Sequence, residues 1–234
     1  MKQVKIRQLV ENDYFVQTEF DRLRVNVGFT GVDKKVIMLS SSRPNEGKSF
    51  VSTNLWIELA KAGKQVCFID ADMRNSYMRS NLRMKFSDSE SGFVGLSHYL
   101  AGANMDDIIY ATNIENAYII PTTNVENPSL LLEGDRFKTL LGYLRTQFDY
   151  VIIDTPPLEL ISDGLRIAGI CDGCILVIHA HVTGRNDVLK CAAMLENINC
   201  PLLGVVLNQQ EDKKIGKYRK YAYQDYKYKY YYGK

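Results

Sequence analysis

The chain has 234 residues, of which 46% are hydrophobic, a size and composition that suit one large α/β domain with a sizeable core. Charged side chains interrupt the first twelve residues, which excludes the apolar region of a signal peptide, and nowhere do 18 apolar residues follow one another. We therefore expect a soluble, cytoplasmic protein.

The net charge of +2 is unevenly distributed. Residues 213–234 contain eight Lys and Arg and one Asp, a charge of +7, which leaves −5 on residues 1–212. The same segment holds eight of the fifteen tyrosines, without a hydrophobic period: Tyr218, Tyr221, Tyr223, Tyr226, Tyr228, Tyr230, Tyr231 and Tyr232. This predicts a domain at 1–212 and a flexible tail at 213–234 that an enzyme can reach. The charge alone also suits attraction to nucleic acid or an anionic membrane.

The expected elements alternate along the chain. A helix is expected at 14–27, before the first strand. Five short apolar runs without clean alternation predict strands buried on both faces, at 35–40, 65–70, 150–154, 173–179 and 202–207. Helical periods lie between them, at 49–62, 136–148 and 187–198. The order predicts a doubly wound, mostly parallel α/β sheet with right-handed crossovers, and surface loops at 74–95 and 121–134.

The junction between the first strand and the next helix carries a phosphate-binding motif. Residues 42–49 read Ser-Arg-Pro-Asn-Glu-Gly-Lys-Ser, and backbone N–H groups of such a loop point at phosphate oxygens. The lysine reaches the β- and γ-phosphates, and the last serine can bind Mg²⁺. The predicted cradle comprises Arg43, Pro44, Asn45, Glu46, Gly47, Lys48, Ser49 and Phe50. Ser42 replaces the first glycine of the consensus, so a chance Gly-Lys-Ser at a helix start stays open as the alternative.

Three aspartates follow predicted strands, at the sheet edge where ligands bind in open α/β folds. Asp70 and Asp72 come after one strand, and Asp154 ends another. An unpaired carboxylate buried there is costly, and a bound Mg²⁺ removes that cost. The alternative for each is an Asp that caps a helix or forms a turn.

Three further positions keep two interpretations each. Asn208 ends the last predicted strand, where it either contacts adenine or forms a turn. Asp163 either senses the γ-phosphate or caps a helix. His179 and His181 could form a metal pair, but alternation at a strand end explains them more simply.

Three segments together resemble the Walker A, A′ and B motifs of the bacterial tyrosine kinases of capsule and exopolysaccharide synthesis: 42–49, 66–74 and 151–156. The terminal tyrosine cluster strengthens the resemblance. It implies a P-loop NTPase fold of the MinD/ParA-like branch and an ATP-dependent kinase that phosphorylates its tail between subunits. It also implies a membrane-embedded activator of the polysaccharide co-polymerase type, which recruits the kinase to the inner face of the membrane, and a tyrosine phosphatase. Nucleic acid is not an expected partner.

The resemblance also suggests a role for each charged residue. Lys48 and the amides of residues 45–50 would hold the phosphates. Ser49, Asp72 and Asp154 would bind Mg²⁺ directly or through water. Asp70 would orient the tyrosine hydroxyl and take its proton as the new bond forms, because a phenol has a pKa of about 10.

One family feature is absent. Many members carry Glu-x-x-Arg-x-x-Arg in the N-terminal helix for ring assembly, and here the aligned positions are Thr18, Asp21 and Arg24. A homo-oligomer is expected, but its stoichiometry and a ring stay open. The rival hypotheses are a partitioning ATPase, against which Arg43 and the tyrosine tail count, and a nucleotide-binding scaffold without kinase activity.

Overall fold

The computed structural model describes residues 2–9, 12–87, 92–160 and 162–210. Within them lie nine strands: β1 (Lys2–Lys5), β2 (Val36–Ser41), β3 (Val66–Asp70), β4 (Lys85–Phe86), β5 (Tyr110–Thr112), β6 (Ala117–Ile120), β7 (Tyr150–Asp154), β8 (Gly173–His179) and β9 (Leu202–Asn208). The helices are α1 (Tyr14–Gly28), α2 (Lys48–Lys61), α3 (Met78–Asn81), α4 (Leu96–Leu100), η1 (Met105–Asp107), α5 (Pro128–Leu131), α6 (Arg136–Gln147), α7 (Ser162–Ala168) and α8 (Arg185–Asn197).

All nine strands form one sheet in the order β4-β1-β5-β6-β3-β7-β2-β8-β9. The pairs β1–β4 and β5–β6 are antiparallel, and the other pairs are parallel. The five predicted strands form the contiguous half from β3 to β9. Their apolar runs are continuous because both faces are covered: β2, β3 and β7 are buried almost throughout. The predicted fold class is confirmed.

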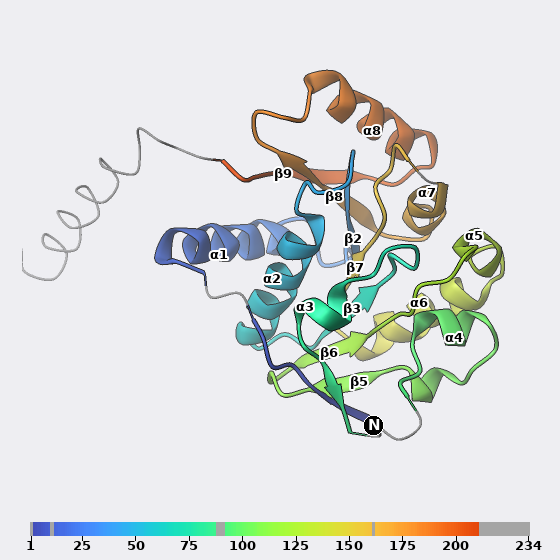
Figure 1. Ribbon diagram of the computed structural model, residues 1–234. Coiled ribbons are helices and arrows are strands. Elements are labelled where there is room, and N and C mark those ends of the chain that lie inside the picture. Colours follow the sequence, from blue (N-terminus) through green and yellow to red (C-terminus); the bar gives the residue numbers. More distant parts are fainter. Residues whose placement is uncertain (1, 10–11, 88–91, 161, 211–234) are drawn as a thin grey trace, which may run out of the picture.

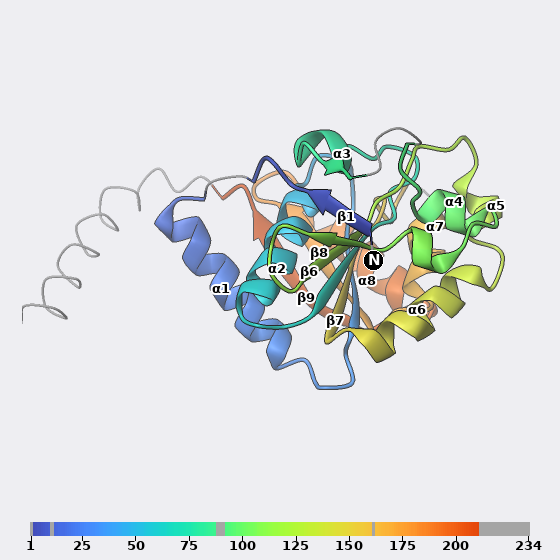
Figure 2. The ribbon, with the colours of Figure 1, turned by 90° about the horizontal axis from the view of Figure 1, so that it is seen from below.

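Helices cover both faces of the sheet (Figures 1 and 2), and a hydrophobic core lies on each face. One core joins β2, β3 and β8 to α1, α2 and α3, and the other joins the same strands to α4, α6, α7 and α8. Helix α2 is buried along most of its length, with Trp56 fully buried against Phe68 of β3. This helix therefore has little freedom to move, and it carries the phosphate-binding motif at its first residues.

The prediction of plain surface loops at 74–95 and 121–134 is wrong in part. The first segment contains α3 and β4, and the second contains α5. Strands β1, β5 and β6 were not predicted either. These elements have two to four residues each, too few for a hydrophobic period to appear, and β1 buries Val4 between the exposed residues Gln3 and Lys5.

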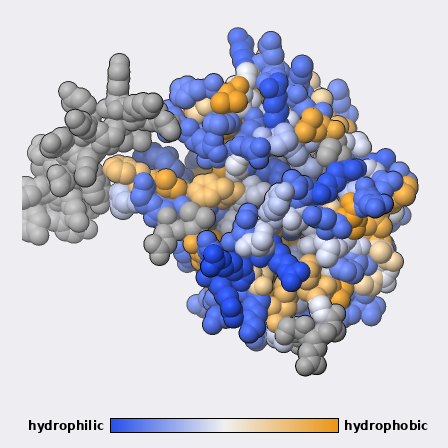
Figure 3. All heavy atoms as spheres, viewed as in Figure 1, coloured by the Kyte–Doolittle hydropathy of each residue, from blue (hydrophilic) through white to orange (hydrophobic). Residues whose placement is uncertain are grey.

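Figure 3 shows a face dominated by hydrophilic residues, with hydrophobic ones in separate small patches. Among the described residues, every helix is too short or too polar to cross a membrane.

Candidate active site

The P-loop connects β2 to α2 at the carboxyl edge of the sheet. Gly47 has a φ of 88°, a left-handed conformation that favours glycine. A Cβ atom at this position would lie 1.9 Å from Nδ2 of Asn208, so the space also requires glycine. The loop and α2 line a cavity of about 340 Å³ with Pro44, Asn45, Gly47, Lys48, Ser49 and Phe50. The motif therefore has the strand–loop–helix setting that phosphate binding needs.

The strand ends bring the predicted aspartates together. Strand β7 lies between β2 and β3, and Asp154 pairs with Leu39 on one side and with Asp70 on the other. Asp72 follows β3 and lines the same cavity as the P-loop. The three carboxylates thus lie around the start of α2, as the sequence predicts.

Lys48 lies among these carboxylates. Its Nζ atom is 3.1 Å from Oδ2 of Asp72, 3.7 Å from Oδ2 of Asp154 and 3.3 Å from the hydroxyl of Ser49. The Ser49 hydroxyl in turn donates to Oδ2 of Asp154 at 2.6 Å. Burial alone would lower the pKa of Lys48. The negative charges of Asp154 and Asp72 have the larger combined effect, so the pKa of the lysine is raised. The side chain stays a cation at the place where phosphate charge would arrive.

Asp70 has a different environment. It is 1% exposed and accepts a short hydrogen bond from the hydroxyl of Ser76. Burial, together with the charges of Asp154 and Asp72, raises the pKa of Asp70 to about 7, although the hydrogen bond from Ser76 and the charge of Lys48 oppose this shift. A carboxyl that changes protonation near neutral pH has the property of a general base.

The oxygens of Ser49, Asp72 and Asp154 fit a magnesium ion. Oδ1 of Asp154 is buried and has no hydrogen-bond partner among the described residues, and burial raises the pKa of this carboxyl. In the part of the chain that the structure describes, no three His, Cys, Asp or Glu side chains converge on one point. Magnesium commonly binds through one or two carboxylates together with waters and substrate phosphates, so this donor set suits it.

Two predicted cradle residues, Arg43 and Glu46, and the predicted adenine contact Asn208 are not among the residues that line this cavity. Arg43 is half exposed and forms an ion pair with Asp187 of α8 at 3.3 Å. Glu46 is 4% exposed, and its carboxylate points into the protein, where Ser42 donates to it. Asn208 donates from Nδ2 to the carbonyl of Glu46 at 3.0 Å. The eight predicted phosphoacceptor tyrosines, and the segment 213–234 that holds them, lie outside the described residues.

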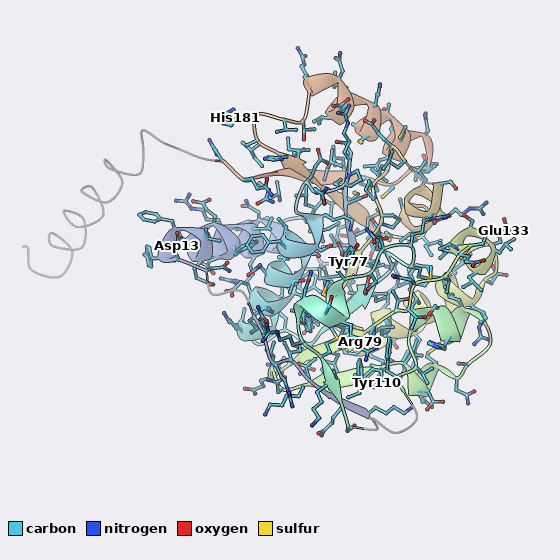
Figure 4. The ribbon with its side chains drawn as sticks, in the orientation of Figure 1. Asp13, Tyr77, Arg79, Tyr110, Glu133 and His181 are labelled. Atoms are coloured by element: carbon cyan, nitrogen blue, oxygen red, sulfur yellow. The ribbon has the colours of Figure 1, made fainter. Side chains whose placement is uncertain are left out.

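The structure adds residues that the motif analysis did not single out. Arg74, Tyr77 and Leu160 line the cavity with the P-loop, and Figure 4 shows Tyr77 before α3. The guanidinium of Arg74 donates to the buried carboxylate of Asp163 at 2.7 Å and to Ser129 at 3.2 Å. Ser129 also donates to Asp163, so both oxygens of this carboxylate are occupied. Arg74 ends the motif segment 66–74, in which Asp70, Asp72 and Arg74 form an Asp-x-Asp-x-Arg pattern, and this pattern was the available signal.

Comparisons with known proteins agree with this geometry. A family model described as an AAA domain matches residues 34–180. The tyrosine-protein kinase CpsD of Streptococcus agalactiae is 36% identical over 225 residues, 94% of each chain. The kinase domain of the Escherichia coli tyrosine kinase ETK has a TM-score of 0.77 at 27% identity, covering 88% of this chain and 84% of that one.

A cell-division protein shares the fold alone. The septum site-determining protein MinD of Pyrococcus horikoshii, solved with Mg-ADP, has a TM-score of 0.65 at 22% identity, covering 77% of this chain and 72% of that one. The 36% identity to CpsD over 94% of the chain favours the tyrosine-kinase family over the partitioning ATPase. Fold, P-loop geometry and relatives together show that the chain belongs to the family of bacterial tyrosine-protein kinases.

Proposed function

We propose that the chain is an ATP- and Mg²⁺-dependent tyrosine autokinase whose domain, residues 1–212, phosphorylates the tail, residues 213–234, of a neighbouring copy. The observation that carries this proposal is the position of Lys48 between Asp72 and Asp154 at the P-loop, with Asp70 beside Asp154. Positioning and neutralisation of charge are what phosphoryl transfer requires of a protein.

The ligand-binding roles follow from the donor atoms. Lys48 and the amides of residues 45–50 hold the phosphates, and Asn208, next to this loop, contacts the base. Ser49, Asp72 and Asp154 would hold Mg²⁺, directly or through water, since Oδ1 of Asp154 has no hydrogen-bond partner in the described part of the chain. The nucleotide supplies the phosphoryl group when bound, and the metal balances its charge.

Asp70 is assigned to the acceptor. It orients the tyrosine hydroxyl and takes its proton while the bond to phosphorus forms, because a phenol stays protonated at neutral pH until then. The raised pKa of Asp70, about 7, supports the role since it lies closer to that of the phenol than an ordinary carboxyl does. Ser76 fixes the direction of the carboxylate.

The biological setting is that of the relatives. We infer a role in capsule or exopolysaccharide synthesis from the similarity to CpsD. A membrane-embedded activator would bring the kinase to the inner face of the membrane, and a phosphatase would reset the tail. In α1, Arg24 pairs with Asp21 of the same helix at 2.6 Å, and Thr18 and Asp21 stand where the family's ring motif has Glu and Arg.

The experiment uses two full-length variants. One has an impaired phosphate-binding site, and the other lacks the acceptor tyrosines. Lys48→Met should lose at least about 100-fold in activity because the cation at the phosphates is gone, while its tail stays intact. A variant with the eight tail tyrosines changed to Phe keeps the active site. Each is incubated alone and then together with ATP and Mg²⁺, with and without the activator's cytoplasmic segment, and is blotted for phosphotyrosine.

Phosphotyrosine is expected on the Lys48→Met chain in the mixture and in neither sample alone. Lys61→Met, an exposed lysine of the same helix, is the matched control and should keep wild-type activity. Signal on Lys48→Met alone would contradict the P-loop assignment. Signal on the Tyr→Phe chain would contradict the tail as the acceptor.

A further inference from the structure

Glu46 is an unusual residue for a loop that receives phosphates. Its carboxylate is negative and 4% exposed, and in the cavity it would repel the anion that the loop binds. The structure turns it to the other side of the loop, where it is not among the cavity-lining residues. The Glu46 carboxylate therefore interacts with the loop and its neighbours and not with the ligand.

Three donors satisfy this carboxylate. The hydroxyl of Ser42 bonds both oxygens, at 2.9 and 3.0 Å, and the backbone N–H of Arg43 bonds Oε2 at 2.9 Å. The hydroxyl of Thr183 donates to Oε1 across 137 positions of sequence. Hydrogen bonds to a charged group are roughly twice as strong as neutral ones, so the set fixes the loop firmly.

Thr183 is itself held in place. It lies on the connection from β8 to α8, where Figure 4 also shows His181. Its hydroxyl accepts from the N–H of His179 at 2.9 Å, and its own N–H donates to the carbonyl of His179 at 3.0 Å. Strand β8 pairs with β2 up to Ser41, so this connection runs beside the P-loop. The hydroxyl thus links two neighbouring connections of the sheet.

We propose that Glu46 is a positioning residue for nucleotide binding: anchored by Thr183, its carboxylate holds the P-loop in the shape that receives the phosphates. The Glu46 carbonyl is held as well, by Nδ2 of Asn208. The inference rests on the proposed nucleotide site and names what keeps that site preformed. We call the hydrogen bond between Thr183 and the Glu46 carboxylate the clasp. Without it, part of the binding free energy is spent on ordering the loop, so the affinity for the nucleotide falls, while the groups that act on the tyrosine stay in place.

The test measures Mg-ADP binding by calorimetry, together with KM for ATP and kcat, on full-length protein. Thr183→Val removes the hydroxyl and keeps the side-chain shape, and Glu46→Gln removes the charge. Each should raise Kd and KM about tenfold and leave kcat within about twofold. Thr183→Ser restores the hydroxyl and should bind like wild type. Thr139→Val, an exposed threonine of α6 that bonds its own helix, is the matched control.

The double variant Glu46→Gln/Thr183→Val decides whether the two residues act together. A shared clasp predicts a loss of about tenfold, equal to either single change, whereas independent residues would lose about 100-fold. The proposal is overturned if the double variant loses affinity by the product of the two single losses, or if the Thr183→Val protein binds Mg-ADP like wild type. If Glu46→Gln does not fold, the Thr183→Val and Thr183→Ser pair still decides. Wild-type protein that does not bind Mg-ADP would instead contradict the proposed function.

Discussion

The three aspartates of the site differ in their surroundings. We therefore expect a different kinetic defect when each is changed to Asn. Asp70→Asn should lower the phosphorylation rate while Mg-ATP still binds, because it removes the proton acceptor. Asp72→Asn and Asp154→Asn should raise the Mg²⁺ concentration needed for half-maximal activity, because each removes a proposed metal ligand. Magnesium titrations of the three variants at saturating ATP provide the measurement. Three identical curves would show that these roles are wrong.

Burial of Asp70 also makes stability depend on pH. The pKa of Asp70 in the folded protein is about 7, above its ordinary value of 3.8, so the folded state favours the protonated carboxyl. This contribution is complete below about pH 4 and is lost as pH rises through 7. Asp70→Asn removes the titration, and should therefore gain stability over wild type between pH 5 and pH 8, by on the order of a few kcal/mol.

Urea unfolding of both proteins without metal or nucleotide, at several pH values, measures this difference. Because Asp154 is buried in both proteins, most of its own titration cancels in the comparison. A difference between the two proteins that stays constant from pH 5 to pH 8 would contradict the raised pKa.

At the scale of elements, one aspartate joins three of them. Asp172, in the turn before β8, accepts from the N–H groups of Lys35 and Val36 at the start of β2, at 2.9 and 2.7 Å. It also pairs with Arg145 of α6. Because the carboxylate is largely buried, its loss takes the ionic partner from Arg145 and the side-chain acceptor from the N–H of Val36, while the N–H of Lys35 keeps a bond to the carbonyl of Asp33.

Asp172→Ala should therefore lower the free energy of unfolding by roughly 3–5 kcal/mol. Asp149→Ala is the matched control: this exposed carboxylate accepts one bond, from the N–H of Gln65 ahead of β3, and its loss should cost about 1 kcal/mol. Chemical denaturation of both variants gives the two values. Equal losses of unfolding free energy in the two variants would mean that the contacts of Asp172 stabilise the protein no more than the exposed contact of Asp149.

The elements that the sequence predicts are those whose signal is local. The apolar runs of β2, β3 and β7 and the stripes of α6 and α8 are complete within one segment. Strand β1 exists because β4 and β5 pair with it, 80 to 110 residues further on, and Val4 alone gives no period. At the site, Lys48, Asp70 and Asp154 follow from motifs at strand ends. The contact between Thr183 and Glu46 does not, because it depends on the neighbouring positions of β2 and β8.

At the scale of the whole molecule, charge is divided between +7 on residues 213–234 and −5 on the rest of the chain. Each phosphotyrosine adds about −1.5 to −2 at pH 7, so modification of eight sites would change the tail to roughly −5 to −9. We expect the unmodified tail to bind acidic surfaces, such as a neighbouring subunit or an anionic membrane, and the phosphorylated tail to be repelled from them.

Sedimentation of the phosphorylated and dephosphorylated protein, with and without acidic liposomes and the activator's cytoplasmic segment, tests this expectation. Association should be stronger for the dephosphorylated protein, and the difference should shrink at high salt. Equal association in both states would refute the charge switch and would leave the kinase assignment intact.

The position of β2 between β7 and β8 has a consequence for the time at which the protein becomes functional. The P-loop is encoded by residue 49, yet β2 needs β7 and β8 on either side, and β8 pairs with it up to Val177. Synthesis at about 5–20 residues per second takes roughly 6 to 26 s over the intervening stretch. A nascent chain therefore carries its complete phosphate-binding sequence for many seconds before it can hold a nucleotide, so no kinase activity arises until nearly the whole domain has been translated.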